Sequence, residues 1–155
     1  MRVAVITISD RASAGIYEDV SGPQIESMLK ERFPNAEISR IVVADEEQAI
    51  VDAFNGQAAA DYIFTTGGTG ISPRDVTPET TKKYCENELP GISELLRAES
   101  YKQTVNAIFS RGYAGVKGRT IIVNFPGSIK AVRLCTAVMM PVMEHGLKML
   151  RGEGH

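Results

Sequence analysis

The sequence has few of the residues on which metal and covalent chemistry depend. Tryptophan is absent, and the 155 residues contain only two cysteines and two histidines. Cys85 and Cys135 lie far apart, in no metal-ligand spacing and no disulfide framework. His145 and His155 complete this small inventory. We therefore expect both cysteines to be reduced and buried like small apolar side chains, and we expect no zinc site.

A strong excess of one charge and a long apolar run are also missing. The formal net charge of −2 argues against nucleic acid or an anionic membrane as the main partner. No apolar run reaches transmembrane length. The apolar start, Met1–Ile6, becomes polar at Thr7, which is too early for a signal peptide. We therefore expect a cytoplasmic protein with neither a nucleic acid nor a membrane partner, although a local anion site remains compatible with this charge.

Glycine, by contrast, is concentrated in one informative segment. Residues 65–70 read Thr-Thr-Gly-Gly-Thr-Gly, and they join an apolar strand pattern at Tyr62–Phe64 to a helix start at Thr77. Three glycines remove Cβ atoms and permit φ > 0, so successive N–H groups can converge on an anion. The segment matches neither a Walker A loop nor the GxGxxG pattern. It is either a tight connection or, as we favour, a cradle for a phosphate group.

The pattern of apolar residues predicts an alternation of strands and helices. Nearly continuous apolar segments indicate buried strands, and apolar residues at a period of 3.6 indicate helices. The predicted strands are 3–8, 38–43, 62–66 and 120–125, and the predicted helices start at Pro23, Asp45, Thr77, Ser93 and Ser128. This order predicts a single α/β domain, residues 1–155, folded as a three-layer α/β/α sandwich with a mostly parallel sheet.

Several helix boundaries depend on particular residues. Thr77 fits an N-cap with Pro78 in the first turn, and Pro90-Gly91 is expected to end that helix. The next helix, 93–102, has Leu95, Leu96 and Tyr101 as its expected apolar positions. Residues 104–118 fit a loop, a short helix and one arm of a hairpin. The last helix is expected to reach about residue 151 with an interruption at Pro141.

Four polar clusters follow predicted strands. They are Ser9-Asp10-Arg11, Asp45, the glycine segment, and residues 124–128. In an open α/β sheet, ligands bind beyond the carboxyl ends of the strands. We therefore expect the four clusters to form one site.

The two acidic residues beside this expected site each have two interpretations. Asp75 could form an Asx-turn or pair with Arg74, or it could face a cation or substrate amine beside a bound phosphate. Asp45 and Gln48 fit a capping box, which by itself makes Asp45 a structural N-cap worth about 1 kcal/mol. Asp10 fits an ordinary turn. The residues alone leave these alternatives open.

The end of the fourth strand is similarly ambiguous, and no protein nucleophile is evident. Ser128 fits the N-cap of the last helix, whereas the Pro126-Gly127 turn could present backbone amides to a ligand. No Ser-His-Asp or Cys-His arrangement can be found near these loops, so we do not expect covalent catalysis by the protein.

These motifs together resemble a known family. The glycine segment followed by Arg74-Asp75-Val76-Thr77-Pro78-Glu79 closely resembles the signature of the molybdopterin-binding fold, and specifically the Mog/MoaB-like molybdopterin adenylyltransferases. The similarity covers nearly the whole chain. Its further matching segments are Ser9 to Ser13, Asp45-Glu46, Leu89-Pro90-Gly91, Ser110-Arg111 and Asn124 to Ser128.

The resemblance implies transfer of an adenylyl group from ATP to molybdopterin with release of pyrophosphate, using Mg²⁺ and usually a homotrimer. It implies that Asp45 and Asp75 are catalytic and are the residues that would hold Mg²⁺. It further implies a transient contact with a molybdenum-insertion protein. The substrate- and nucleotide-binding residues that it implies are Ser9, Asp10, Gly67, Gly68, Thr69, Gly70, Ser110, Pro126, Gly127 and Ser128.

Two other functions remain open within this resemblance. One is a molybdopterin-binding paralogue without catalytic activity, because the fold also serves such proteins. The other is molybdate insertion, which the family pattern assigns to much longer multidomain chains. The presence of both Asp45 and Asp75 favours the enzyme over the passive binder.

Overall fold

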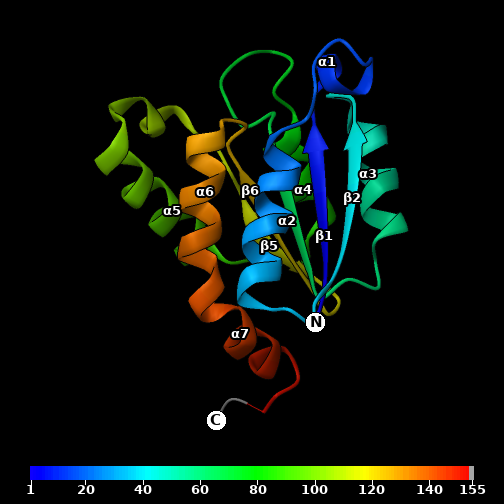
Figure 1. Ribbon diagram of the computed structural model, residues 1–155, viewed down its shortest axis with the longest axis vertical. Helices are drawn as coiled ribbons and strands as arrows, with labels where there is room; N and C mark the ends of the chain where they lie inside the picture. The colour runs from blue at the N-terminus through cyan, green and yellow to red at the C-terminus, as the bar shows by residue number, and fades with distance from the viewer. Residues whose placement is uncertain (154–155) are drawn as a thin grey trace.

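The computed structural model describes residues 1–153, so His155 lies outside the described residues. Its core is a six-stranded sheet in the order β2-β1-β3-β6-β5-β4, shown in Figure 1. The strands are β1 (Arg2–Ile8), β2 (Glu37–Val43), β3 (Tyr62–Thr66), β4 (Asn87–Glu88), β5 (Ala114–Lys117) and β6 (Thr120–Phe125). The pairs β2–β1, β1–β3 and β3–β6 are parallel, while β5 is antiparallel to β6 and β4 is antiparallel to β5. The predicted mostly parallel sheet is therefore confirmed.

Helices cover both faces of this sheet. They are α1 (Asp10–Ser13), α2 (Ser21–Arg32), α3 (Glu47–Gly56), α4 (Thr77–Tyr84), α5 (Pro90–Gln103), α6 (Ile129–Met139) and α7 (Met143–Leu150), with 3₁₀ turns η1 (Val105–Phe109) and η2 (Met140–Val142). One core cluster joins the sheet to α2, α5, α6 and α7, and the other joins it to α3 and to residues near α4. The three-layer α/β/α prediction is confirmed.

The apolar composition of the central strands follows from their burial. Residues 3–8 of β1 and every residue of β3 and β6 are buried. A strand covered by helices on both faces needs apolar side chains in both directions, which gives a continuous pattern rather than an alternating one. The edge strand β2 has no such requirement, and several of its side chains are exposed.

Three predicted boundaries of α4 and α5 were wrong. Helix α4 ends at Tyr84, well before Pro90, because the chain then forms the short strand β4. Pro90 does not end a helix but occupies the first turn of α5, where its missing N–H leaves no bond unmade. The N-cap of α4 is Val76 rather than Thr77, and it makes no side-chain cap bond.

The buried face of α5 also differs from the prediction. Leu96 is buried, but Leu95 and Tyr101 are about half exposed. The side chains that face the interior beside Leu96 are Ser93 and Ser100. An inward helix face made of small polar residues does not produce an apolar periodicity, which explains the error.

The C-terminal part follows its predicted course. Residues 104–118 form η1, a loop and β5, and the final helix is interrupted near Pro141 by η2. Proline there removes a helical N–H donor, so the chain continues as the separate helix α7.

Both cysteines are unpaired thiols in apolar surroundings. Cys135 is buried and Cys85 is partly buried, and burial raises the pKa of Cys135 to about 12 and that of Cys85 to about 11. A thiol with so high a pKa is protonated at neutral pH and therefore a poor nucleophile. The expected burial is confirmed for Cys135, whereas Cys85 is only partly buried.

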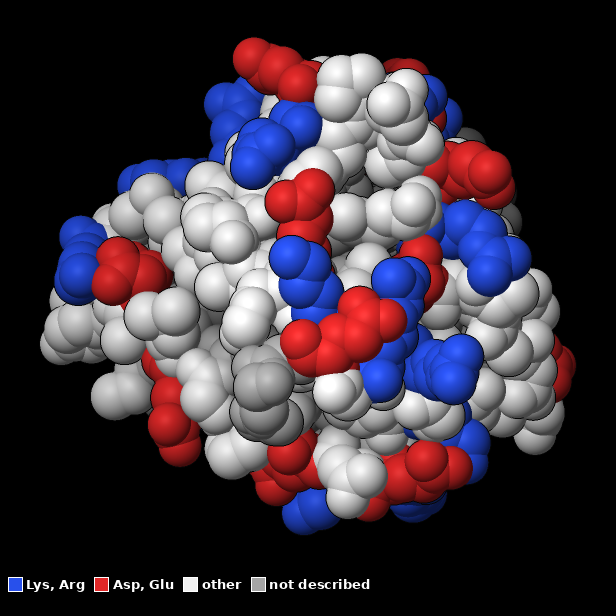
Figure 2. Space-filling model, turned by 90° about the horizontal axis from the view of Figure 1, so that it is seen from below, with Lys and Arg blue, Asp and Glu red and all other residues white. Residues whose placement is uncertain are grey.

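One face of the molecule carries side chains of both charges. On the face shown in Figure 2, Lys and Arg side chains alternate with Asp and Glu rather than gathering into one patch. Among residues 1–153, no helix is both long and apolar enough to cross a membrane.

Asn124 is a buried polar residue that ties β6 to its surroundings. Its Nδ2 donates to Thr65 Oγ1 at 2.9 Å and to Thr81 Oγ1 at 3.0 Å, and its Oδ1 accepts from Tyr113 N at 3.1 Å. One side chain therefore joins β3, α4 and the segment before β5.

We predict that Asn124→Ala lowers the free energy of unfolding by roughly 2–4 kcal/mol, because it leaves several buried polar groups without a partner. Urea denaturation measures this loss. The exposed residue Asn55 provides the matched control, and Asn55→Ala should change stability by only about 0.5 kcal/mol. Equal effects of the two substitutions would contradict the prediction.

Candidate functional site

The four polar clusters meet at one edge of the sheet. Strands β2, β1, β3 and β6 are adjacent and parallel, so their carboxyl ends lie together. In Figure 1 the green loop after β3 rises at the same upper end as α1. Direct contacts join the clusters: Gly67 N donates to Phe125 O at 3.2 Å, and Thr66 Oγ1 donates to Pro126 O at 3.0 Å.

The glycines of the loop are required by its backbone. Gly67 and Gly68 have φ values of 101° and 63°, which lie in a region that side chains disfavour. A Cβ on Gly67 would collide with the carbonyl oxygen of Ile8, and one on Gly68 would collide with Thr77 Oγ1. Both residues therefore need the absence of a side chain for conformation and for space.

In residues 68–70 of the loop, the carbonyl groups are hydrogen-bonded and the N–H groups are not. The N–H groups of Gly68, Thr69 and Gly70 make no hydrogen bond within residues 1–153, whereas the carbonyls of all three accept one. Backbone donors without internal partners at a glycine-rich turn form an anion-binding concavity. This geometry supports the cradle interpretation over a merely tight connection.

Arg111 holds the bonded side of the loop. Its backbone N donates to Thr69 O at 2.9 Å, its Nε to Gly70 O at 2.7 Å and its Nη2 to Asp75 O at 2.7 Å. Its Nη1 pairs with Glu79. The guanidinium group thus fixes both the loop and the backbone of Asp75. Sequence reasoning gave this side chain no role, and the only signal was its place in the Ser110-Arg111 motif.

An acidic pair lies beside the loop. Asp10 N donates to Asp45 Oδ2 at 2.8 Å, and Asp45 N donates to Asp10 Oδ1 at 3.0 Å. This reciprocal bonding ties the end of β1 to the end of β2. Burial raises the pKa of Asp45, and the negative charges of Asp10 and Asp75 raise it further, against the opposing hydrogen bond from Asp10 N. Three carboxylates are therefore concentrated at this point of the edge.

The capping interpretation of Asp45 was wrong. Helix α3 starts at Glu47 with Glu46 as its N-cap, and no side chain caps it. Gln48 bonds to Asp52 instead of closing a capping box. Asp45 is thus free of any helical role and faces the glycine loop, since a Cβ on Gly68 would lie 3.0 Å from Asp45 Oδ1.

Arg74 and Asp75 do not pair with each other. Arg74 binds both carboxylate oxygens of Asp10, at 2.8 and 3.0 Å from Nη2, and binds Glu46 Oε1 at 2.9 Å. Asp75 Oδ2 accepts from Ser72 N at 2.8 Å. The Arg74 pairing considered for Asp75 is therefore wrong, and a local turn bond is present instead.

Two predicted site serines serve helix starts. Ser9 Oγ accepts from Ala12 N and Ser128 Oγ accepts from Ala131 N, each at 3.2 Å. The predicted N-cap at Ser128 is confirmed. Gly127 lies beside the glycine loop, because a Cβ on it would contact Gly67 Cα at 3.4 Å.

A cleft opens next to the loop. It has a volume of about 400 Å³ and is lined by Thr69, Gly70, Ser110, Pro126 and Ser128 on the site side and by η1 on the other. Its size suits one flat ring system with polar substituents. The edge therefore holds two regions: the acidic residues around Gly68 and this cleft.

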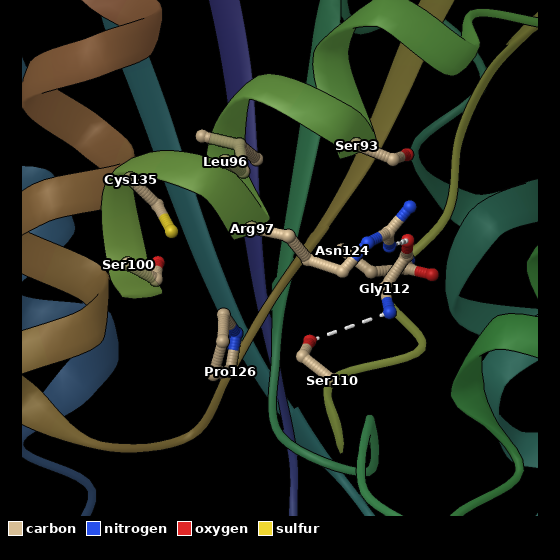
Figure 3. Close-up of a pocket in the computed structure, with 9 residues that line it drawn as sticks. All are labelled: Ser93, Leu96, Arg97, Ser100, Ser110, Gly112, Asn124, Pro126 and Cys135. Atoms are coloured by element: carbon tan, nitrogen blue, oxygen red, sulfur yellow. Dashed lines mark hydrogen bonds between the residues drawn. The ribbon is translucent and has the colours of Figure 1, made fainter. Parts of the chain in front are cut away.

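A small pocket lies next to the cleft, lined by residues of α5, α6, β6 and the segment 110–112 (Figure 3). Its volume is about 10 Å³, roughly that of one water molecule. It shares Ser110 and Pro126 with the cleft, and Ser110 Oγ is a weak acceptor for Gly112 N at 3.4 Å. The hydroxyl of Ser93, which borders the pocket, makes no hydrogen bond within residues 1–153.

We predict that Arg111→Met, which keeps an unbranched stem but removes every side-chain donor, lowers the free energy of unfolding by about 2 kcal/mol. Hydrogen exchange should accelerate most at the bonded amides of this segment, Asp75 N–H and Thr77 N–H, because the carbonyls of Gly70 and Asp75 lose the guanidinium. The exposed Arg119 supplies the control, and Arg119→Met should leave both quantities nearly unchanged. Unaltered exchange in the loop of the Arg111 variant would refute the assigned role.

Comparisons with known proteins place the chain in a family. The model of a family described as a probable molybdopterin binding domain matches residues 4–145. A molybdopterin adenylyltransferase of Helicobacter pylori is 39% identical over 156 residues, which cover 98% of this chain and 89% of the relative. A molybdenum cofactor biosynthesis bifunctional protein of Synechococcus elongatus is 37% identical, and the match covers 97% of this chain and 48% of that protein.

A solved structure shares the fold. The crystal structure of a molybdopterin biosynthesis protein from Mycobacterium abscessus superposes with a TM-score of 0.89 at 34% identity, covering 97% of this chain and 96% of that one. The family match and these relatives span nearly the entire chain. The chain therefore belongs to the family of probable molybdopterin binding domains.

Proposed function

We propose that this protein is a molybdopterin adenylyltransferase of molybdenum cofactor biosynthesis. It transfers AMP from ATP to the terminal phosphate of molybdopterin and releases pyrophosphate. The observation that carries this proposal is the glycine loop, in which Thr69 and Gly70 have unbonded N–H groups and line a cleft large enough for a ring system. The activity in the name of the Helicobacter pylori relative supports it.

This reaction needs no nucleophile from the protein. A terminal phosphate oxygen of molybdopterin forms a bond to the α-phosphorus of ATP, and the bond from that phosphorus to the bridging oxygen of pyrophosphate breaks. Catalysis of phosphoryl and adenylyl transfer rests on positioning and charge neutralisation. Amides that are fixed in advance supply this without reorganisation, and the bonds from Thr77 N to Gly68 O and from Arg111 N to Thr69 O hold the peptide planes that carry the N–H groups of Thr69 and Gly70.

The acidic residues fit Mg²⁺ as the accompanying cation. Carboxylate oxygens are ligands that Mg²⁺ prefers, and the ion usually takes only one or two from protein, with water and phosphate oxygens completing its shell. Asp45 and Asp75 are close enough for the charge of one to raise the pKa of the other. Among residues 1–153, no group of three or more His, Cys, Asp or Glu side chains is placed to hold a metal ion. Bound beside Asp45 and Asp75, Mg²⁺ would neutralise phosphate charge.

We assign the residues of the edge to two roles. Asp45 and Asp75 act as the catalytic carboxylates. Substrate and nucleotide are bound by residues of the strand ends and the cleft: Ser9, Asp10, Gly67, Gly68, Thr69, Gly70, Ser110, Pro126, Gly127 and Ser128. For Ser9 and Ser128 the capping bonds occupy the hydroxyls, so their contribution is to place the neighbouring backbone.

We further propose that the single domain, residues 1–155, acts in the cytoplasm as a homotrimer and passes its product to a molybdenum-insertion protein. An apolar groove of about 540 Å³, bordered by half-exposed Leu95, Val142 and Met149, supports self-association. The bifunctional relative supports proximity to a second biosynthetic activity. Equilibrium sedimentation tests the trimer, and a monomeric mass would exclude it.

The proposed function predicts an adenylylated product. Purified protein incubated with molybdopterin, ATP and Mg²⁺ should form adenylylated molybdopterin and pyrophosphate, both detected by mass spectrometry and a coupled phosphate assay. Asp75→Asn should reduce turnover by at least about 10²-fold, since it removes charge that helps hold the cation near the phosphates. Its circular dichroism should match wild type.

The controls separate the enzyme from a passive binder. Omission of molybdopterin should abolish pyrophosphate release. Binding of molybdopterin without any product from the wild-type protein would instead indicate a non-catalytic paralogue. Full turnover by folded Asp75→Asn protein would refute the catalytic role of Asp75, but it would not contradict the proposed reaction.

Asp45→Asn provides an independent prediction. An asparagine oxygen can still accept from Asp10 N, and no helix cap is lost, so the free energy of unfolding should change by only about 0.5 kcal/mol. Turnover should nevertheless fall by about 10²-fold, because the negative charge beside Gly68 is gone. Steady-state kinetics and urea denaturation measure the two effects, and undiminished turnover would leave Asp45 with a structural role only.

A further inference from the structure

The hydroxyl of Thr77 is buried and makes no hydrogen bond within residues 1–153. Such groups destabilise a fold and are uncommon. The other buried hydroxyls of α4 are bonded: Thr80 Oγ1 donates to Val76 O and Thr81 Oγ1 donates to Thr77 O, both at 2.8 Å. Thr77 neither bonds back along its helix nor caps it. Its hydroxyl therefore does not serve the helix that carries it.

Thr77 faces the glycine loop and Asp45. Its Oγ1 is the atom nearest to the position that a Gly68 Cβ would take, and Asp45 Oδ1 is the next nearest, at 3.0 Å from that position. Thr77 N also donates to Gly68 O at 3.2 Å. The hydroxyl and the carboxylate oxygen thus border the same small space, which exists because Gly68 has no side chain.

Thr77 Oγ1 and Asp45 Oδ1 are a hydrogen-bond donor and an acceptor that each lack a partner within residues 1–153. Asp45 Oδ2 accepts from Asp10 N, but Asp45 Oδ1 accepts from no donor within residues 1–153. The charged groups that act on Asp45 are Asp10, Asp75 and Arg74, and Arg74 is engaged by Asp10 and Glu46. The Thr77 hydroxyl is consequently a donor that has no acceptor in the described part of the chain. It lies beside Asp45 Oδ1, a carboxylate oxygen that has no donor there.

We propose that Thr77 is the positioning residue for Asp45, and that its hydroxyl donates to Asp45 Oδ1 when ligand draws the loop and the carboxylate together. The inference rests on the proposed function, in which Asp45 works beside the bound phosphates. Thr77 lies beneath Gly68 and is fully buried, so it acts through Asp45 rather than by touching the ligand. Donation to Asp45 Oδ1 gives the buried hydroxyl the partner that residues 1–153 otherwise do not provide.

Substitutions of nearly equal size isolate this hydroxyl. Thr77→Val replaces it with a methyl group, and Thr77→Ser retains it. Thr80→Val, one turn away on the same helix, is the matched control that loses an ordinary helix bond. Thr77→Ala repeats the test should valine prove too large for the site.

Two measurements separate positioning from packing. Calorimetry with ATP and Mg²⁺ should show about tenfold weaker affinity for Thr77→Val, the loss expected for one hydrogen bond to a charged group. Thr77→Ser should bind within about twofold of wild type, and Thr80→Val should bind normally. Without ligand, the melting temperature of Thr77→Val should equal or exceed that of wild type, because an unpaired hydroxyl has been removed.

A double-mutant cycle tests whether Thr77 acts through Asp45. In an Asp45→Ala background, Thr77→Val should cause no further loss of affinity, since the acceptor is already absent. Wild-type affinity of Thr77→Val, failure of Thr77→Ser to restore binding, or an undiminished effect in the Asp45→Ala background would each overturn the proposal. Binding is measured without turnover, so absence of adenylyl transfer would refute the proposed function and leave this test intact.

Discussion

The candidate site depends on the hydrogen bonds that hold the glycine loop by its carbonyl groups. Arg111 supplies donors to the carbonyls of Thr69, Gly70 and Asp75, while the N–H groups of residues 68–70 remain without internal partners. A peptide plane held by its carbonyl presents its N–H in a fixed direction. The loop can therefore bind an anion without first being reorganised, which is the physical basis of electrostatic preorganisation.

This arrangement is supported in turn by the sheet. Four parallel strands end at one edge, and buried polar side chains join that edge to the helices behind it. Asn124 connects β6, β3 and α4, and the reciprocal bonds of Asp10 and Asp45 connect the ends of β1 and β2. The site thus combines a rigid scaffold with a loop whose charged neighbours repel one another, and such repulsion is relieved when a cation or a positively polarised ligand binds.

The predictions that failed did so for local reasons. Asp45 and Gln48 match a capping box in spacing, but the helix starts two residues later and the carboxylate turns to Asp10 instead. Pro90 is compatible with both a helix end and a first turn, and only the presence of β4 decides between them. Leu95 and Tyr101 follow the helical period yet are half exposed, because serines occupy the inward positions.

The sequence alone determined the fold class, the four parallel strands and the polar segments that meet at their carboxyl ends. Continuous apolar strands and three clustered glycines are local properties, so they can be recognised without a structure. Tertiary structure decided which groups face one another: the guanidinium of Arg111 behind the loop, Arg74 on Asp10 rather than Asp75, and Thr77 beside Asp45. These contacts join residues far apart in the chain, and no local pattern specifies the direction in which a polar side chain will find its partner.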